Sequence, residues 1–275
     1  MRAAVLGSPV AHSLSPVLHT AAYKALGLAA WNYEAIECHE AQLPALLRSC
    51  GPDWAGLSLT MPLKRAIMPL LDRAEPLAGE VGAANTVVFA GGTRRGYNTD
   101  VPGMVTALAP AGAVVTGPAL IIGAGATACA ALAALRALGI GQAEVAARDP
   151  ARAGDLLAAA GRLGVQVRLV PFGQLPRARS GLLLISTVPA GAADIYAERV
   201  GAAAAVPAAL LDVVYQPWPT RLADAAAAAG ALVAGGFDLL LHQAARQVEL
   251  MTGQAAPTDA MREAGLAELS ARPPG

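Results

Sequence analysis

Short apolar runs alternate with amphipathic segments through the first part of the chain. The runs predict strands at residues 2–6, 31–36 and 56–59, and segments with helical spacing follow them at 15–26, 41–48 and from Pro62 onward. Ser15 precedes a proline and is expected to be the N-cap of the first helix, which Gly27 ends. This β-α-β-α-β-α order predicts an α/β domain.

The same region closes with a predicted hairpin. Apolar positions at 85–89 and 93–97 lie on either side of Gly91-Gly92, a pair typical of a tight turn between two strands. Asp100 then begins a predicted helix over 101–109. The N-terminal part of the first domain is expected to end there.

The second half of the chain has the pattern of an open parallel sheet. Predicted strands at 119–122 and 143–147 enclose a glycine-containing turn and a helix, and further strands are predicted at 165–169, 182–185, 210–214 and 231–233. Two helices, 237–252 and 257–270, end the chain and are expected to return to the first domain. We therefore expect two domains, residues 1–101 completed by 237–275, and a Rossmann-like doubly wound domain of residues 102–236.

Composition and charge narrow the functional classes. The chain has 275 residues, is 55% hydrophobic with only 4% aromatic residues, and has a formal net charge of +0 without acidic or basic blocks. This balance argues against nucleic acid or an anionic membrane as partner and favours a small molecule. The three cysteines are far apart and suggest neither a disulfide framework nor a metal site. The uncharged stretch 119–135 is too short to span a bilayer, and no signal peptide is recognised, so a cytoplasmic protein is expected.

A dinucleotide fingerprint follows the strand at 119–122. It matches G-x-G-x-x-A immediately before a predicted helix, with residues Gly123, Ala124, Gly125, Ala126, Thr127 and Ala128. The first glycine permits a tight turn, the second allows the backbone to approach a pyrophosphate, and the alanine permits close packing of the helix. The alternative is a tight strand-to-helix turn without a ligand.

The residues after the next strand bear on the choice between NADP and NAD. Arg148 and Arg152 can pair with the 2′-phosphate of NADP, whereas Asp149 would be repelled by it and could hold an unphosphorylated ribose. The two arginines favour NADP. NAD stays possible, and Asp149 could also simply cap the following helix.

Lysine is rare in this chain. Of 20 cationic side chains only Lys24 and Lys64 are lysines. A lysine can release its proton whereas an arginine in a protein cannot, so a retained lysine is a candidate acid or base. Lys24 lies on a predicted helix face where simple solvation explains it.

Several motifs together resemble the shikimate dehydrogenase family in the correct order. They are Gly7-Ser8-Pro9 with Ser13-Leu14-Ser15-Pro16, Ser58-Leu59-Thr60-Met61-Pro62-Leu63-Lys64, Asn85-Thr86, Asn98-Thr99-Asp100, the loop from Gly123, Ser186-Thr187, Asp212-Val213-Val214-Tyr215 and Gln243-Ala244-Ala245. The likeness spans nearly the whole chain.

The resemblance implies an enzyme that reduces 3-dehydroshikimate to shikimate with NADPH in aromatic amino-acid biosynthesis, binding its substrate in a cleft between the two domains. By position it implies that Lys64 and Asp100 are the catalytic pair. It implies that the substrate is bound by Ser13, Ser15, Ser58, Thr60, Lys64, Asn85, Asp100, Tyr215 and Gln243. The cofactor residues it implies are Gly123, Ala124, Gly125, Ala126, Thr127, Arg148, Asp149, Arg152, Thr187, Val213 and Gly236. It leaves open a monomer or a homodimer.

Ser58 departs from the family pattern, in which an asparagine is common. A shorter hydroxyl replaces an amide, so Ser58 is expected to reach the substrate through water. The alternatives kept open are an NAD-preferring quinate/shikimate dehydrogenase, another two-domain Rossmann enzyme with a lysine such as a methylenetetrahydrofolate dehydrogenase, and a catalytically silent NADP or shikimate binder. Taken singly, Asn85 could begin a hairpin, Tyr215 could be core, and Gln243 could be exposed.

Overall fold

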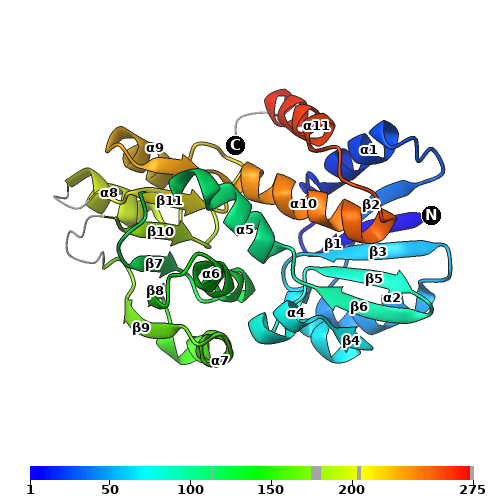
Figure 1. Cartoon of the computed structure of the whole chain (residues 1–275), viewed down its shortest axis with the longest axis horizontal. Coiled ribbons are helices and arrows are strands. Elements are labelled where there is room, and N and C mark those ends of the chain that lie inside the picture. Colours follow the sequence, from blue (N-terminus) through cyan, green and yellow to red (C-terminus); the bar gives the residue numbers. More distant parts are fainter. Residues whose placement is uncertain (113, 175–180, 203–205, 273–275) are drawn as a thin grey trace. The chain divides into compact units, whose positions relative to one another are not determined.

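A computed structural model describes the chain except for residues 113, 175–180, 203–205 and 273–275. The chain divides into two compact units (Figure 1). The first contains Met1–Asp100 and the segment from Leu240 to Arg272, and the second contains Val101–Leu239. The boundaries predicted from the sequence lie after residues 101 and 236. Among the described residues, no helix combines the length and hydropathy needed to cross a membrane.

The first unit is built on a mixed sheet of strand order β2-β1-β3-β5-β6-β4. Its strands are β1 (Arg2–Gly7), β2 (Asn32–Glu37), β3 (Trp54–Leu59), β4 (Arg73–Ala74), β5 (Thr86–Ala90) and β6 (Thr93–Tyr97). Strands β1, β2 and β3 run parallel, while β5 is antiparallel to β3 and to β6, which gives the expected hairpin.

Helices cover both faces of this sheet because neighbouring strand residues point to opposite sides. They are α1 (Ser15–Ala25), α2 (Leu43–Ser49), α3 (Leu63–Ala66), α4 (Pro76–Val81), α10 (Gly236–Thr252) and α11 (Thr258–Ala271). Leu57 and Leu59 of β3 pack with α2, α3 and α4, whereas Ala55 and Val88 pack with Tyr23 of α1 and Met251 of α10. Helices α1 and α11 contact one another (Figure 1).

The predicted cap of the first helix is wrong. The helix begins at Ser15, and its N-cap residue is Leu14, which already has a right-handed helical backbone. The Ser13 hydroxyl accepts a hydrogen bond from the Ser15 backbone N–H at 3.2 Å. Ser15 therefore lies inside the first turn, and its side chain is not used as a cap.

The second unit is a parallel sheet of strand order β12-β11-β10-β7-β8-β9. Its strands are β7 (Ala119–Ile122), β8 (Gln142–Ala147), β9 (Gln166–Pro171), β10 (Leu183–Ser186), β11 (Ala209–Asp212) and β12 (Leu232–Ala234). Its helices are α5 (Asp100–Leu108), α6 (Ala126–Ala137), α7 (Gly154–Leu163), α8 (Asp194–Ala202) and α9 (Arg221–Ala228). The chain starts at β7 in the middle and proceeds outward in both directions, as expected for a doubly wound fold.

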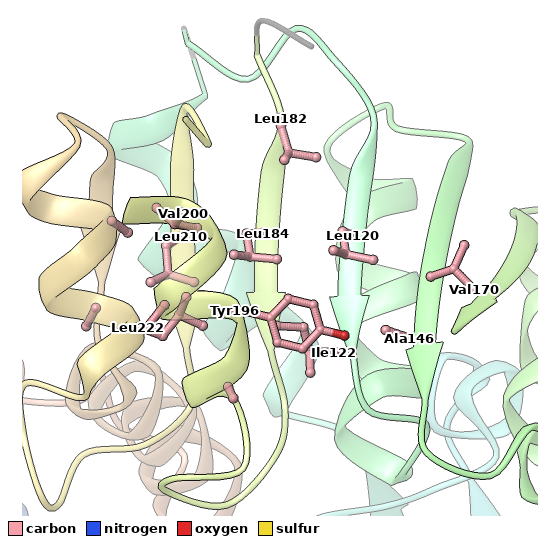
Figure 2. Close-up of a cluster of buried hydrophobic side chains, with 14 residues drawn as sticks. Leu120, Ile122, Ala146, Val170, Leu182, Leu184, Tyr196, Val200, Leu210 and Leu222 are labelled. Atoms are coloured by element: carbon pink, nitrogen blue, oxygen red, sulfur yellow. The ribbon is translucent and has the colours of Figure 1, made fainter. Parts of the chain in front are cut away.

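A buried apolar cluster joins α8 and α9 to one face of this sheet. Figure 2 shows Leu120, Leu184 and Leu210 from adjacent strands pointing toward Tyr196 and Leu222 of the helices. The Tyr196 hydroxyl accepts a hydrogen bond from the Gly173 backbone N–H at 2.8 Å, so its one polar atom is satisfied. This core holds β7, the strand that the fingerprint loop follows, together with its neighbours in the sheet.

Candidate active site

The topology of the first unit brings four chain segments to one edge of its sheet. Strands β1, β3 and β6 end at this edge, and β5, which runs the opposite way, begins there. The segments leaving β1 and β3 carry Ser13 and Lys64, the residue before β5 is Asn85, and Asp100 comes shortly after β6. Residues far apart in the sequence therefore share one sheet edge, where the ligands of α/β sheets usually bind.

Lys64 and Asp100 form a close, largely buried ion pair. The distance from Lys64 Nζ to Asp100 Oδ2 is 2.6 Å, and the two side chains are 16% and 8% exposed. Lys64 lies in the short helix α3, and its backbone carbonyl accepts a hydrogen bond from the Ala84 N–H at 2.9 Å. The pair thus places a proton-carrying amine beside a carboxylate with little water around it.

Asn85 connects this pair to its surroundings. Its Nδ2 atom donates to Asp100 Oδ1 at 2.8 Å and to the Thr99 hydroxyl at 2.9 Å. Its Oδ1 atom accepts from the Thr99 backbone N–H at 2.7 Å. Because Asn85 is 1% exposed and holds these bonds, it does more than begin a hairpin.

Gln243 of α10 joins the same group. Its Oε1 accepts from Asn85 Nδ2 at 3.3 Å and from the Thr99 hydroxyl at 3.4 Å, and its Nε2 donates to the Leu240 carbonyl at 3.0 Å. At 7% exposed it is buried, so the alternative of an exposed helix position is wrong. Tyr215 belongs to the second unit, follows β11 and is half-buried.

Two serines and a threonine complete the hydroxyl groups at this edge. Ser13 is half-buried, and Ser15 is 4% exposed. Thr60 directly follows β3, and its side chain occupies the space where a Cβ on Gly7 would stand. Gly7 therefore has to be a glycine for the loops after β1 and β3 to approach each other.

Ser58 has two protein partners. Its hydroxyl accepts from the Tyr33 hydroxyl at 2.7 Å and donates to Gln247 Oε1 at 2.8 Å. Sequence reasoning missed Tyr33 and Gln247. Alternation along β3 could have indicated that Ser58 faces α1 and α10, because Leu57 and Leu59 belong to the opposite face, but it could not select these partners.

In the second unit the fingerprint loop leaves open space at the start of α6. Gly123 has a φ of +105°, and a Cβ there would meet the Thr187 side chain. No atom lies within 4 Å of the position of a Cβ on Gly125, which is the N-cap of α6 and has no side chain to engage the first helical N–H groups. Open space beside the N-terminus of α6, a helix of twelve residues, fits the pyrophosphate of a dinucleotide.

The acidic and basic residues after β8 have different surroundings. Asp149 Oδ1 accepts from the Ala151 backbone N–H at 3.1 Å and so caps the short 3₁₀ helix Pro150–Ala153. Arg148 and Arg152 are exposed. The carboxylate therefore has a local structural use, while two guanidinium groups face solvent near the end of β8.

Of three more predicted cofactor residues, Thr187 and Val213 follow β10 and β11, and Gly236 is the first residue of α10. The Thr187 hydroxyl donates to the Ile122 carbonyl at 2.7 Å, which ties the loop after β10 to that after β7. Gly236 lies against the backbone of Val213, where no side chain would fit. Burial raises the pKa of the neighbouring Asp212 carboxyl, although hydrogen bonds from Thr220 and Val214 act against this.

Comparisons with known families agree with this architecture. A family model described as the shikimate dehydrogenase substrate binding domain matches residues 5–87, and one described as the shikimate 5′-dehydrogenase C-terminal domain matches residues 236–264. A shikimate dehydrogenase (NADP(+)) of Thermus thermophilus is 39% identical over 265 residues, which cover 96% of this chain and 97% of that protein.

Solved structures give the same result. The shikimate dehydrogenase of Mycobacterium tuberculosis is 42% identical with a TM-score of 0.85, over 97% of this chain and 99% of that one. The Thermus thermophilus enzyme in complex with NADP(H) and shikimate is 37% identical with a TM-score of 0.81, over 97% and 99% of the two chains. With its two-unit α/β fold, its fingerprint loop and this degree of identity over its length, the chain belongs to the shikimate dehydrogenase family.

Proposed function

We propose that this chain catalyses the reversible, NADPH-dependent reduction of 3-dehydroshikimate to shikimate. The observation that carries the proposal is the buried pair in which Lys64 Nζ lies 2.6 Å from Asp100 Oδ2, in a chain of the shikimate dehydrogenase family. A reaction that turns a ketone into an alcohol needs a proton donor at the developing alkoxide.

Lys64 acts as the general acid in the reducing direction and as the general base in reverse. When bound, NADPH supplies a hydride to the carbonyl carbon. The Lys64 ammonium gives a proton to the oxygen, and its charge stabilises the alkoxide as that charge develops. Asp100 orients the amine through the 2.6 Å contact, and Asn85 holds the other carboxylate oxygen.

The remaining hydroxyl and amide groups bind the substrate. Ser13 and Ser15 lie at the start of α1, where helix N–H groups favour the substrate carboxylate. Thr60, Asn85 and Gln243 offer neutral donors and acceptors suited to ring hydroxyls. Tyr215 is proposed from its place in the family motif.

The second unit binds NADP through the loop from Gly123 to Thr127. The open space at Gly125 and the start of α6 suit the pyrophosphate. Arg148 and Arg152 pair with the 2′-phosphate, and Asp149, the residue that would favour NAD, has a local structural use as a helix cap. Thr187, Val213 and Gly236 line the neighbouring loops.

We place this activity in the cytoplasm, in a monomer or homodimer. The three cysteines are free thiols, as expected in a reducing compartment. Light scattering after size-exclusion chromatography would decide between the two assemblies.

The test is the nicotinamide absorbance while purified protein oxidises shikimate or quinate with NADP or NAD. We expect the highest kcat/KM for shikimate with NADP. A preference for NAD, or for quinate, would support the quinate/shikimate alternative. Binding of NADP and shikimate without turnover in any combination would contradict the proposal and support a silent binding protein.

A further inference from the structure

A second set of polar side chains lies behind the catalytic pair, buried between β3, α1 and α10. Tyr33 is 5% exposed, Ser58 4% and Gln247 1%. The proposed mechanism gives these groups no role. Polar side chains buried to this degree are costly unless they are hydrogen-bonded, so their arrangement needs an explanation.

These groups form one chain of hydrogen bonds that ends on Asp100. The Tyr33 hydroxyl donates to Ser58 at 2.7 Å, and Ser58 donates to Gln247 Oε1 at 2.8 Å. Gln247 Nε2 donates to the Thr86 hydroxyl at 3.0 Å, which donates to Asn85 Oδ1 at 3.0 Å. Asn85 Nδ2 then donates to Asp100 Oδ1 at 2.8 Å.

Two backbone atoms fix the direction of this chain. Gln247 Nε2 also donates to the Asn85 backbone carbonyl at 3.4 Å, so a reversed Gln247 amide would set oxygen against oxygen. The Thr99 backbone N–H donates to Asn85 Oδ1 at 2.7 Å, which likewise directs Asn85 Nδ2 toward Asp100. At the far end, burial raises the pKa of the Tyr33 hydroxyl far above its ordinary value, so it keeps its proton. Each link is therefore a donor pointing toward the carboxylate.

We propose that Gln247, together with Ser58 and Tyr33, is a positioning residue that holds Asn85, and through it Asp100, in the arrangement that orients Lys64. Hydrogen bonds aligned in one direction polarise and strengthen one another, and a carboxylate held at Oδ1 presents Oδ2 to the lysine in one geometry. The inference rests on the proposed function, because it assigns these residues to the same reaction.

The same arrangement explains the serine at position 58. A hydroxyl accepts from Tyr33 and donates to Gln247 at a single oxygen atom. Its proton is already given to Gln247, and its side chain is buried. Ser58 therefore acts in this chain as a link between Tyr33 and Gln247 and not as a substrate ligand.

The far end of the hydrogen-bond chain reaches α1, whose first residue, Ser15, is proposed to bind the substrate carboxylate. The Tyr33 ring stacks on His19 of α1, with ring centres 3.9 Å apart. His19 Nδ1 lies 2.9 Å from the Ser15 carbonyl. One buried set of contacts thus spans from α1 to the catalytic pair.

The experiment measures kcat and KM for shikimate at saturating NADP in Gln247→Leu, Ser58→Ala and Tyr33→Phe. We expect kcat to fall by about tenfold to a hundredfold in Gln247→Leu, as for a misplaced catalytic group. Ser58→Ala should lose about fivefold to tenfold and Tyr33→Phe about twofold to threefold, because each breaks the chain farther from Asp100. KM for shikimate should change less than kcat in Gln247→Leu and Ser58→Ala.

Val248→Ala is the matched control. Val248 is fully buried next to Gln247 on α10 but belongs to no hydrogen bond of this set, so its truncation lowers stability without altering the pair. If Gln247→Leu and Ser58→Ala keep the kcat of Val248→Ala, the inference is overturned. A rise in KM alone for Ser58→Ala would make Ser58 a substrate ligand and also overturn it. Absence of turnover in the unmodified protein would instead overturn the proposed function.

Discussion

The candidate sites of the first and the second unit consist of different kinds of groups. In the first, side chains that are nearly all buried bond to one another around Lys64 and Asp100. In the second, the fingerprint loop offers backbone, two glycines and a helix N-terminus, and the charged residues after β8 are exposed. The first site depends on many mutual contacts, and the second depends on space left open.

This difference predicts how each site responds to substitution. A change in the side-chain network leaves buried partners without hydrogen bonds, so its effect passes to neighbouring groups. A change in the loop acts through steric overlap with the ligand or with one neighbour, so its effect stays local.

Removing the Lys64 amine should have the largest effect. Lys64→Ala removes the proton donor, so kcat should fall by about a hundredfold to ten-thousandfold, with a smaller change in KM. Lys24→Ala is the matched control, because Lys24 is the other lysine of the chain and is exposed. Near-normal kcat in Lys64→Ala would refute its assignment as the acid.

Acid should destabilise the first unit through protonation of His19. Burial lowers the pKa of His19 from 6.5 to about 4, only partly offset by its bond to the Ser15 carbonyl, and Nε2 has no partner among the described residues. The folded unit keeps His19 neutral while the unfolded chain takes up a proton below pH 6.5. Protonation of His19 therefore does not affect the free energy of unfolding well above pH 6.5. It lowers this free energy by about 3 kcal/mol as the pH falls from 6.5 toward 4.

Urea unfolding of the unmodified protein and of His19→Gln checks this prediction. A Trp218→Phe background restricts the fluorescence to Trp31 and Trp54, both in the first unit. The loss of unfolding free energy between pH 6.5 and pH 4 should be smaller in His19→Gln by about 3 kcal/mol. Equal losses in both proteins would show that His19 is not held neutral.

The glycines of the fingerprint loop should separate ligand binding from folding. Gly125 has φ −80°, which alanine adopts, and open space at its Cβ, so Gly125→Ala should raise KM for NADPH by about tenfold while the unfolding free energy changes little. Gly123→Ala should weaken NADPH binding and also lower the unfolding free energy, because Gly123 has a positive φ and a Cβ there would meet Thr187. Gly161→Ala in α7 is the control away from the loop, and it should leave KM for NADPH unchanged while raising the unfolding free energy by up to about 1 kcal/mol. A stability loss in Gly125→Ala equal to that in Gly123→Ala would contradict this division.

The smallest effect is expected from the exposed arginines. Arg148→Ala should raise KM for NADPH by about threefold to tenfold and leave KM for NADH nearly unchanged, because an exposed charge pair with the 2′-phosphate is worth about 1 kcal/mol. Parallel kinetics with the two cofactors check this. Equal changes in KM for NADPH and for NADH would mean that Arg148 does not bind the 2′-phosphate.

The sequence predicts best the features that lie in one continuous segment. The loop from Gly123, the hairpin around Gly91 and most strands follow from local spacing and turn residues. The cap at Ser15 failed because serine preference cannot tell that Leu14 already has helical backbone angles. The predicted N-cap, Ser15, therefore lies one residue after the N-cap in the structure, Leu14.

The buried network could not be predicted, because it depends on packing between distant segments. Ser58 and Gln247 are 189 residues apart, and nothing in either local sequence indicates their contact. Asn85 and Asp100 were recognised through the family motif, whereas the direction of their hydrogen bond required the positions of the Thr99 N–H and the Gln247 amide.

The central claim is that Lys64 and Asp100 act as one catalytic unit, and a double-mutant cycle tests it most directly. We would measure kcat for shikimate oxidation in Lys64→Ala, in Asp100→Ala and in the variant carrying both. If the two side chains act together, the double variant should be about as slow as the slower single variant. If the two reductions in kcat multiply, the residues act independently and the account is contradicted.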